Sequence, residues 1–227
     1  MRIVAGKRYY ALVASLPRLP HFEQAEYLPI SREELLSRLR MLDPLHWRQL
    51  EAAIELLRWQ KQPRERSDAA IASQYAAAMA TITDPNLREL VTYWMGQRLV
   101  VMSLRLKALG ESLSFETPWA LLPLHGKLAR HWDDADLGVV ALFPWVNQAR
   151  ELIEAQDAMS LERLLIGAVW RRINEIDNRS AFGFERVVSF VFKWEHTKRW
   201  LSYDAVAAKQ RFQQLMTEVV GDQQLFA

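Results

Sequence analysis

Cysteine is absent from all 227 residues of the chain. Disulfides, thiolate-bound metals and a cysteine nucleophile are therefore excluded, and we expect the chain in a reducing cytoplasm. The start of the sequence supports one alternative, because Lys7 and Arg8 precede a short apolar run as they would in a signal peptide. That run is at the short end for a signal peptide, and Pro17 and Arg18 follow it directly, so the cytoplasm is the preferred prediction.

Charge of one sign and long apolar runs are also lacking. Lys and Arg number 29 against 27 Asp and Glu, which gives a formal net charge of +2. This balance creates no strong field for DNA or for an acidic membrane. The longest apolar stretch, residues 139–146, is far shorter than the roughly 18 residues that a spanning helix needs. We predict no nucleic-acid partner and no direct membrane insertion, so attachment to an inner membrane would be peripheral and through a complex.

The common catalytic motifs are missing as well. A phosphate-binding loop has two glycines five residues apart, followed by Lys and Ser or Thr. Gly126-Lys127 supplies part of this pattern, but Leu121 stands where the first glycine should be and Leu128 follows the lysine. The GxSxG elbow of hydrolases and the HExxH zinc pair are absent. We therefore predict that the chain is not an enzyme and needs no cofactor.

One group of polar residues could in principle bind a metal: His125, His131, Asp133, Asp134 and Asp136. Imidazole and carboxylate groups are ligands for divalent cations. The spacing matches no known class of site, however. We prefer the alternative of a polar loop in which Asp134 or Asp136 caps the following helix, and we predict no metal.

Helix signals are abundant in the first half of the chain. Ser31 and Glu34 have the spacing of a capping box. Asp43-Pro44 and Asp84-Pro85 each place an N-cap before a proline at the first helical position. Apolar residues at helical spacing follow these caps, and an alanine-rich helix is expected from residue 67 or 68 to 79. The longest predicted helix runs from residue 85 to Gly110, a suitable C-terminal cap.

The pattern breaks at residues 113–146, which contain three prolines and two glycines, and only short helices are expected there. Further helices are predicted at 145–156, 161–176, 184–194 and 208–219, the last ended by Gly221. Only residues 2–4 and 9–13 could form strands, and a helix suits 9–13 equally well. The sequence predicts an all-α, multi-helix fold with two similar lobes, 1–112 and 113–227, that form a cup or funnel. One continuous domain is the alternative.

Nine tryptophans are the most prominent of the remaining features. Most of them fall on apolar stripes of predicted helices, where packing in the core is the expected role. Trp119, Trp132 and Trp145 lie instead in the interrupted middle region. Tryptophan is enriched at the centres of protein interfaces, so these three are the candidate partner-binding residues.

Three segments resemble proteins of vacuolar-type (V-type) ATPase systems. Residues 9–17, followed by Leu28-Pro29-Ile30-Ser31, resemble an uncharacterised bacterial family encoded among V-type ATPase subunits. Residues 182–200 and 87–110 resemble repeats of the C-type adaptor subunit of V-type ATPases, which is the d-type adaptor in eukaryotes. This adaptor is an all-helical, funnel-shaped protein that seats the central stalk on the membrane rotor ring. It is longer and has three similar helical units, whereas this chain has room for about two.

The resemblance implies a non-catalytic adaptor subunit of a V-type ATPase, with the central stalk and the rotor ring as its partners. A stiff helical cup would clasp the helical end of another protein of the complex and transmit or stabilise torque. The alternative is a helical regulatory or assembly protein that binds its partner transiently.

Overall fold

The computed structural model describes residues 8–57, 68–112 and 124–223. These residues form nine α-helices and one short 3-10 helix, and no strand occurs among them. The prediction of an all-α fold is therefore confirmed. Residues 9–13, which could have formed a strand, belong largely to the first helix.

The N-terminal helices begin where their caps predict. Ser31 Oγ accepts a hydrogen bond from Glu34 N at 3.2 Å, and Ser31 N donates to Glu34 Oε2 at 3.1 Å, so the capping box is complete. Asp43 Oδ1 accepts from Leu45 N at 2.9 Å at the start of the next long helix. The elements in this part are α1 (Tyr10–Ser15), η1 (Phe22–Gln24), α2 (Arg32–Leu39), α3 (Pro44–Leu57) and α4 (Asp68–Thr81).

Helix α5 (Pro85–Ala108) lies at the centre of the fold and contacts α3, α6, α7, α8 and α9. Asp84 Oδ1 caps its start by accepting from Leu87 N at 2.8 Å. At the other end Gly110 has a φ of +72°, a left-handed conformation that glycine adopts without steric cost. Both ends were predicted correctly, since the fixed φ of proline suits the first helical position and the conformational freedom of glycine suits the left-handed residue after the helix.

The second half contains α6 (His125–Arg130), α7 (Val146–Glu154), α8 (Ala158–Asp177) and α9 (Phe184–Gln223). As predicted, the interrupted middle region contributes one short helix, α6, to the described residues. The prediction of separate helices at 184–194 and 208–219 was wrong, because both belong to α9. No proline or glycine occurs between residues 184 and 220, so nothing in the backbone ends the helix there. Gly221 lies within its last turn.

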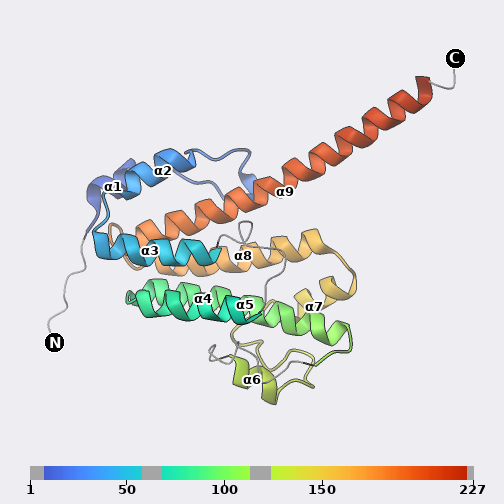
Figure 1. Cartoon of the computed structure of the whole chain (residues 1–227), viewed down its shortest axis with the longest axis horizontal. Coiled ribbons are helices and arrows are strands. Elements are labelled where there is room, and N and C mark those ends of the chain that lie inside the picture. The colour runs from blue at the N-terminus through green and yellow to red at the C-terminus, as the bar shows by residue number, and fades with distance from the viewer. Residues whose placement is uncertain (1–7, 58–67, 113–123, 224–227) are drawn as a thin grey trace.

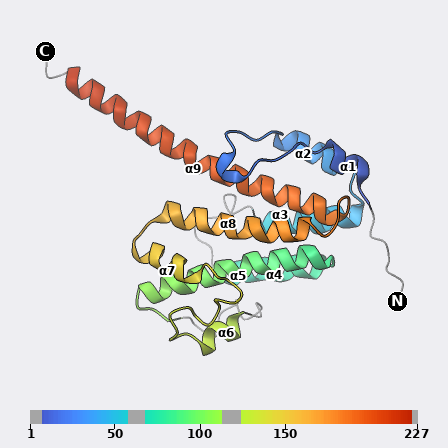
Figure 2. The ribbon, with the colours of Figure 1, turned by 180° about the vertical axis from the view of Figure 1, so that it is seen from behind.

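The helices stack in layers around α9 and α8 (Figures 1 and 2). Helices α1 and α2 lie on one side of α9, while α8 and α3 pack against its other side, followed by α5 and α4. Beyond this body α9 continues as a single projecting helix toward the C-terminus (Figure 1). Among the described residues, no helix combines the length and the apolar character needed to span a bilayer.

One buried cluster links the two halves of the chain. It contains Leu12, Leu50 and Leu99 from the first half together with Val146 and Trp194 from the second. Residues 1–112 and 113–227 thus share a core, while the division into two lobes and the cup shape stay predictions.

Buried polar groups fix the turns between the layers. Gln49 is 1% exposed, and its Oε1 accepts hydrogen bonds from Thr83 N at 2.8 Å and Asp84 N at 2.7 Å. The indole N–H of Trp194 donates to Ile30 O at 3.0 Å. Because a buried polar group without a partner is costly, these bonds specify how α3 meets the α4–α5 turn and how the segment before α2 meets α9.

Candidate functional site

A groove with a volume of about 680 Å³ lies where α5, α8 and α9 meet, and Ile71 of α4 also lines it. Residues 94–109 of α5, 158–169 of α8 and 196–203 of α9 line it. At 1.5 Å per residue, the wall that α5 provides is about 22 Å long, or roughly four helical turns. The groove is therefore elongated along the helix axes.

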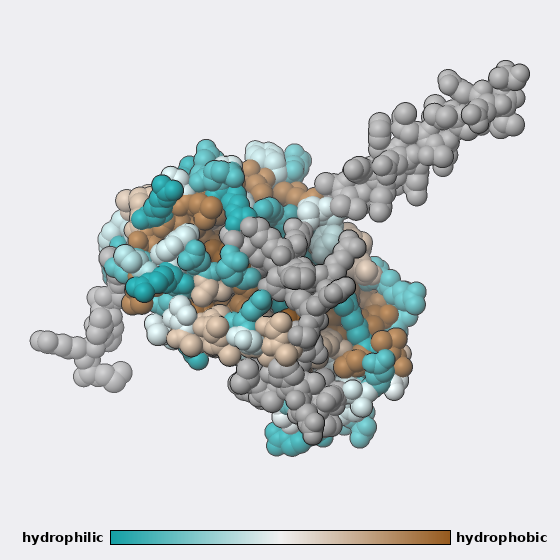
Figure 3. All heavy atoms as spheres, viewed as in Figure 1, coloured by the Kyte–Doolittle hydropathy of each residue, from teal (hydrophilic) through white to brown (hydrophobic). Residues whose placement is uncertain are grey.

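The interior of the groove is mainly apolar. Two hydrophobic side chains at the groove are also open to solvent, since Leu109 is 72% exposed and Met159 is 45% exposed. On the face drawn in Figure 3, hydrophobic residues reach the surface in separate patches between polar ones. The other aliphatic side chains that line the groove are Ile71, Val101, Met102, Leu106, Ala158, Leu165, Ile166 and Val169.

The apolar pattern of α5 explains why a groove forms here. The apolar positions of this helix cover more than one face, so one face fills the core and the other remains for the groove. Buried Gln97 fixes the distance between the two walls, because its Nε2 donates to Leu165 O at 2.9 Å. A nearly buried side chain thus links the α5 and α8 walls of the groove.

A paired arginine and glutamate lie within the groove. Arg199 Nε is 2.7 Å from Glu162 Oε1, and Arg199 Nη2 donates to Glu162 Oε2 at 2.9 Å, so the two groups form a fork. Burial raises the pKa of Glu162, while the charges of Arg199 and Arg105 act in the opposite direction. Both carboxylate oxygens are occupied by Arg199.

His196 forms part of the groove wall and is 5% exposed. Its Nδ1 is 2.8 Å from Phe192 O, and because a carbonyl can only accept, the proton lies on Nδ1. Burial lowers the pKa of His196 to about 4, with the charge of Arg199 acting in the same direction. The imidazole is therefore neutral near pH 7.

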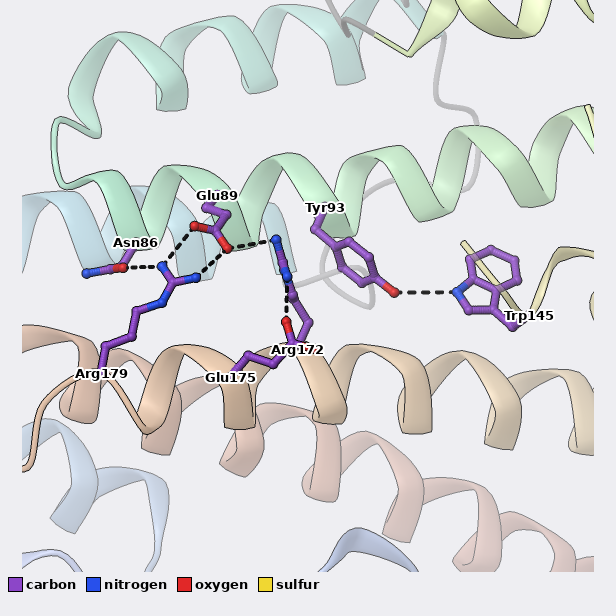
Figure 4. Close-up of polar contacts among 7 residues, drawn as sticks. All are labelled: Asn86, Glu89, Tyr93, Trp145, Arg172, Glu175 and Arg179. Atoms are coloured by element: carbon purple, nitrogen blue, oxygen red, sulfur yellow. Dashed lines mark hydrogen bonds and ion pairs between the residues drawn. The ribbon is translucent and has the colours of Figure 1, made fainter. Parts of the chain in front are cut away.

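A polar network joins α5 to α8 at the end away from the groove (Figure 4). Arg179 donates to both carboxylate oxygens of Glu89 at 2.9 Å, and Arg172 Nη2 lies 2.8 Å from the same carboxylate. The hydrogen bonds from Arg179 lower the pKa of Glu89, with the charges of both arginines adding to the effect and burial opposing it. Arg172 also lies over the Tyr93 ring at 5.7 Å. The Arg172 guanidinium is therefore already bound by groups of the same chain.

The three tryptophans predicted to bind a partner have different environments. Trp119 lies outside the described residues. Trp145 is 3% exposed and packs against Phe143, and its indole N–H donates to the Tyr93 hydroxyl at 3.4 Å. Trp132 is half-buried, with Lys107 Nζ 5.9 Å from its ring. Neither Trp132 nor Trp145 lines the groove between α5, α8 and α9.

The loop with His131, Asp134 and Asp136 is closed by hydrogen bonds. His131 Nδ1 is 2.7 Å from Asp134 Oδ2, and Asp136 Oδ1 accepts from Gly138 N at 2.9 Å. Lys107 Nζ donates to the carbonyl oxygens of Trp132 and Asp134, both at 2.7 Å. The described residues contain no group of three or more potential ligands that could hold a metal. The prediction that Asp134 or Asp136 caps the following helix was wrong, because they bind within the loop and α7 begins only at Val146.

The sequence pattern did not identify Glu162 or the groove. Arg105 and Arg199 stand out in the sequence only as basic residues near predicted helix ends, where cations favour the helix dipole. Glu162 and Arg199 are 37 residues apart, and no periodicity connects them. The one available signal was the apolar pattern of α5, which covers more than one face.

No family model matches the chain, and neither a curated protein nor a solved structure matches it.

Proposed function

We propose that this chain is a non-catalytic helical adaptor that binds a helical segment of another protein in the groove between α5, α8 and α9. The observation that carries the proposal is an elongated apolar groove with Leu109 72% exposed and Met159 45% exposed at it. A helix that lies in a groove presents apolar residues at positions i, i+3, i+4 and i+7 along one face. Four turns of α5 provide enough length for such a set.

Covering the exposed apolar side chains at the groove would contribute favourably to binding. Complete burial of an exposed Leu or Met side chain is worth about 1.5–3 kcal/mol. Leu109 and Met159 are already partly covered, so a partner that covers both would gain roughly 2–3 kcal/mol from them. The rest of the groove adds to this, against the cost of association.

Helix α9 gives the adaptor a mechanical role. Residues 196–203 of this helix line the groove, and the same helix continues past the body toward the C-terminus (Figure 1). A partner in the groove would therefore contact the element that leaves the body. In the proposed mechanism, α9 transmits force between the bound helix and whatever contacts its far end.

The resemblance of residues 87–110 and 182–200 to repeats of the C-type adaptor suggests the partner complex. These segments contain most of α5 and the first part of α9, two of the three walls of the groove. We accordingly propose a V-type ATPase as the assembly, with a protein of the central stalk or the rotor ring as the partner. The second candidate, a regulatory or assembly protein that binds transiently, would use the same groove.

Co-purification of the full-length tagged chain from its native cells tests the proposal. We expect V-type ATPase subunits in constant stoichiometry with the wild-type chain, and their loss with Leu109→Asp. Leu45→Asp is the matched control, because Leu45 is also an exposed leucine, at 53%, but lies on α3 outside the groove. Substoichiometric recovery would favour the regulatory protein, and absence of ATPase subunits from the wild-type preparation would refute the ATPase assignment.

A further inference from the structure

We infer that the segment recognised by the groove is an acidic amphipathic helix that places its carboxylates beside Arg105. The inference rests on the proposed function, which supplies the helical partner, and adds the chemistry of that partner. It follows from the charges that line the groove and from the position of Arg105 among them.

The groove carries an excess of positive charge. Its charged lining residues are Arg98, Arg105 and Arg199 against Glu162, and three minus one gives a formal charge of +2. The whole chain of 227 residues has the same formal net charge of +2, so the groove lining is more basic than the chain taken as a whole. A partner with an acidic face would therefore meet a field of opposite sign along this surface.

Part of the excess charge lies around Glu162. Arg199 binds both oxygens of this carboxylate, so the carboxylate is unavailable to a cationic partner. Burial raises the pKa of Glu162, and Arg105 is near enough for its charge to oppose that rise. Arg199 alone pairs with this carboxylate, so the positive charge of nearby Arg105 is left over at this part of the groove.

Arg105 is the group that can meet a partner. Its side chain is exposed on the α5 wall, and it forms no hydrogen bond or ion pair with the described part of the chain. Arg199, by contrast, is held by Glu162. An exposed arginine beside an apolar groove is suited to a carboxylate, because its planar donors match the two carboxylate oxygens.

The surroundings of Arg105 select a helix over a compact anion. Val101 and Met102 line the groove one turn before Arg105, and Leu109 lies one turn after it. Apolar contacts therefore continue on both sides of the charge along the α5 axis. A partner helix alongside α5 would repeat this order, with an apolar stripe along one face and acidic residues at the edge of that stripe.

Charged residues at the edge of an apolar contact act mainly on the specificity and the rate of association. Complementary charges orient the approaching helix, and a like charge placed opposite an arginine is strongly unfavourable. The apolar contacts would supply most of the affinity. Exchanging the acidic residues for lysines should therefore lower affinity strongly, while affinity for the acidic helix should decrease with salt.

The test uses two synthetic 18-residue helical peptides as probes. Both have leucines at i, i+3, i+4 and i+7 spacing, and they differ only at two positions at the edge of this stripe, which are Glu in one peptide and Lys in the other. Binding to the full-length chain is measured by fluorescence anisotropy at 0.05 and 1 M salt. We expect the Glu peptide to bind at least about tenfold more tightly at low salt, and the difference to narrow at 1 M, where the screening length falls to about 3 Å.

Two charge-reversal variants of the chain test the role of Arg105. Arg105→Glu should reduce or reverse the preference for the Glu peptide, whereas Arg171→Glu should leave it unchanged, since Arg171 is exposed on α8 outside the groove. Equal affinity of both peptides, with both lost in Leu109→Asp, would overturn the inference of an acidic partner and leave a helix-binding groove in place. Binding to vesicles of anionic phospholipid with no binding of either peptide would also overturn it, while co-purification with the ATPase would still decide the proposed function.

Discussion

The buried histidine of the groove makes stability depend on pH in a way that can be calculated. His196 is neutral in the folded chain, because burial lowers its pKa from 6.5 to about 4. In the unfolded chain the imidazole regains a pKa of about 6.5. Between these two values the unfolded state binds more protons than the folded state, so stability falls as the pH is lowered.

The magnitude follows from the difference between the two pKa values. At pH 5 the unfolded imidazole is almost fully protonated while His196 in the fold remains mostly neutral, which costs about 2 kcal/mol. At pH 7 the same term is only about 0.2 kcal/mol. The wild-type chain should therefore lose about 2 kcal/mol of unfolding free energy from His196 alone between pH 7 and pH 5.

Urea unfolding of the wild type and of His196→Asn at pH 7, 6 and 5 isolates this term. Asparagine can keep an N–H near the Nδ1 position that donates to Phe192 O, but it does not titrate. The cost of the substitution itself is the same at each pH, so the change in the difference between the two proteins reports His196. Parallel pH profiles, or an imidazole that titrates near pH 6.5 by NMR in the folded chain, would refute the reasoning.

Three further predictions concern contacts outside the groove. Trp194→Phe should cost at least about 1–3 kcal/mol in urea unfolding, because Ile30 O loses its buried donor; a negligible change would mean that another donor reaches this carbonyl. Gly110→Ala should lower the free energy of unfolding by about 1–2 kcal/mol, because Gly110 has a positive φ. Gly138→Ala should lower it more, since an added Cβ at Gly138 would also lie 2.6 Å from a side-chain atom of His131. Equal losses for the two variants would argue against this clash. Glu89→Gln should lower the free energy of unfolding at neutral pH, because the pKa of Glu89 is lowered and its contacts with the arginines favour the ionised carboxylate. The difference in unfolding free energy between wild type and variant should shrink as the pH falls below 4.5, where this carboxylate becomes protonated. A constant difference down to pH 2 would contradict this.

Much of the helical layout was predictable because its signals are local. The capping box at Ser31, the Asp-Pro pair before α5 and the glycine after it each act through hydrogen bonds or backbone angles within a few residues. The error at α9 has a local cause too. The prediction of two helices there placed a break near residues 195–207, where no residue interrupts a helix, and took Gly221 as a helix end.

The environments of the predicted binding tryptophans could not be predicted in the same way. Trp145 follows a proline in an irregular segment, which suggested a surface position, yet it is buried against Phe143 and Tyr93. Burial at an irregular position depends on which distant helix covers it. Here α5 contacts α7 and the segment just before α7. No local sequence pattern specifies this contact between distant segments.

The sequence by itself determined the all-α class, the boundaries of most helices and the absence of cysteine chemistry, because each of these depends on residue type and short-range spacing. Only the tertiary structure decided that α5, α8 and α9 leave an apolar groove, that Arg199 binds Glu162 across 37 residues, and that Arg105 stays exposed beside it. The physical reason is that helix formation is encoded in hydrogen bonds four residues apart. A groove and its charge arise instead from the order in which whole helices pack, and that order depends on contacts between residues distant in the chain.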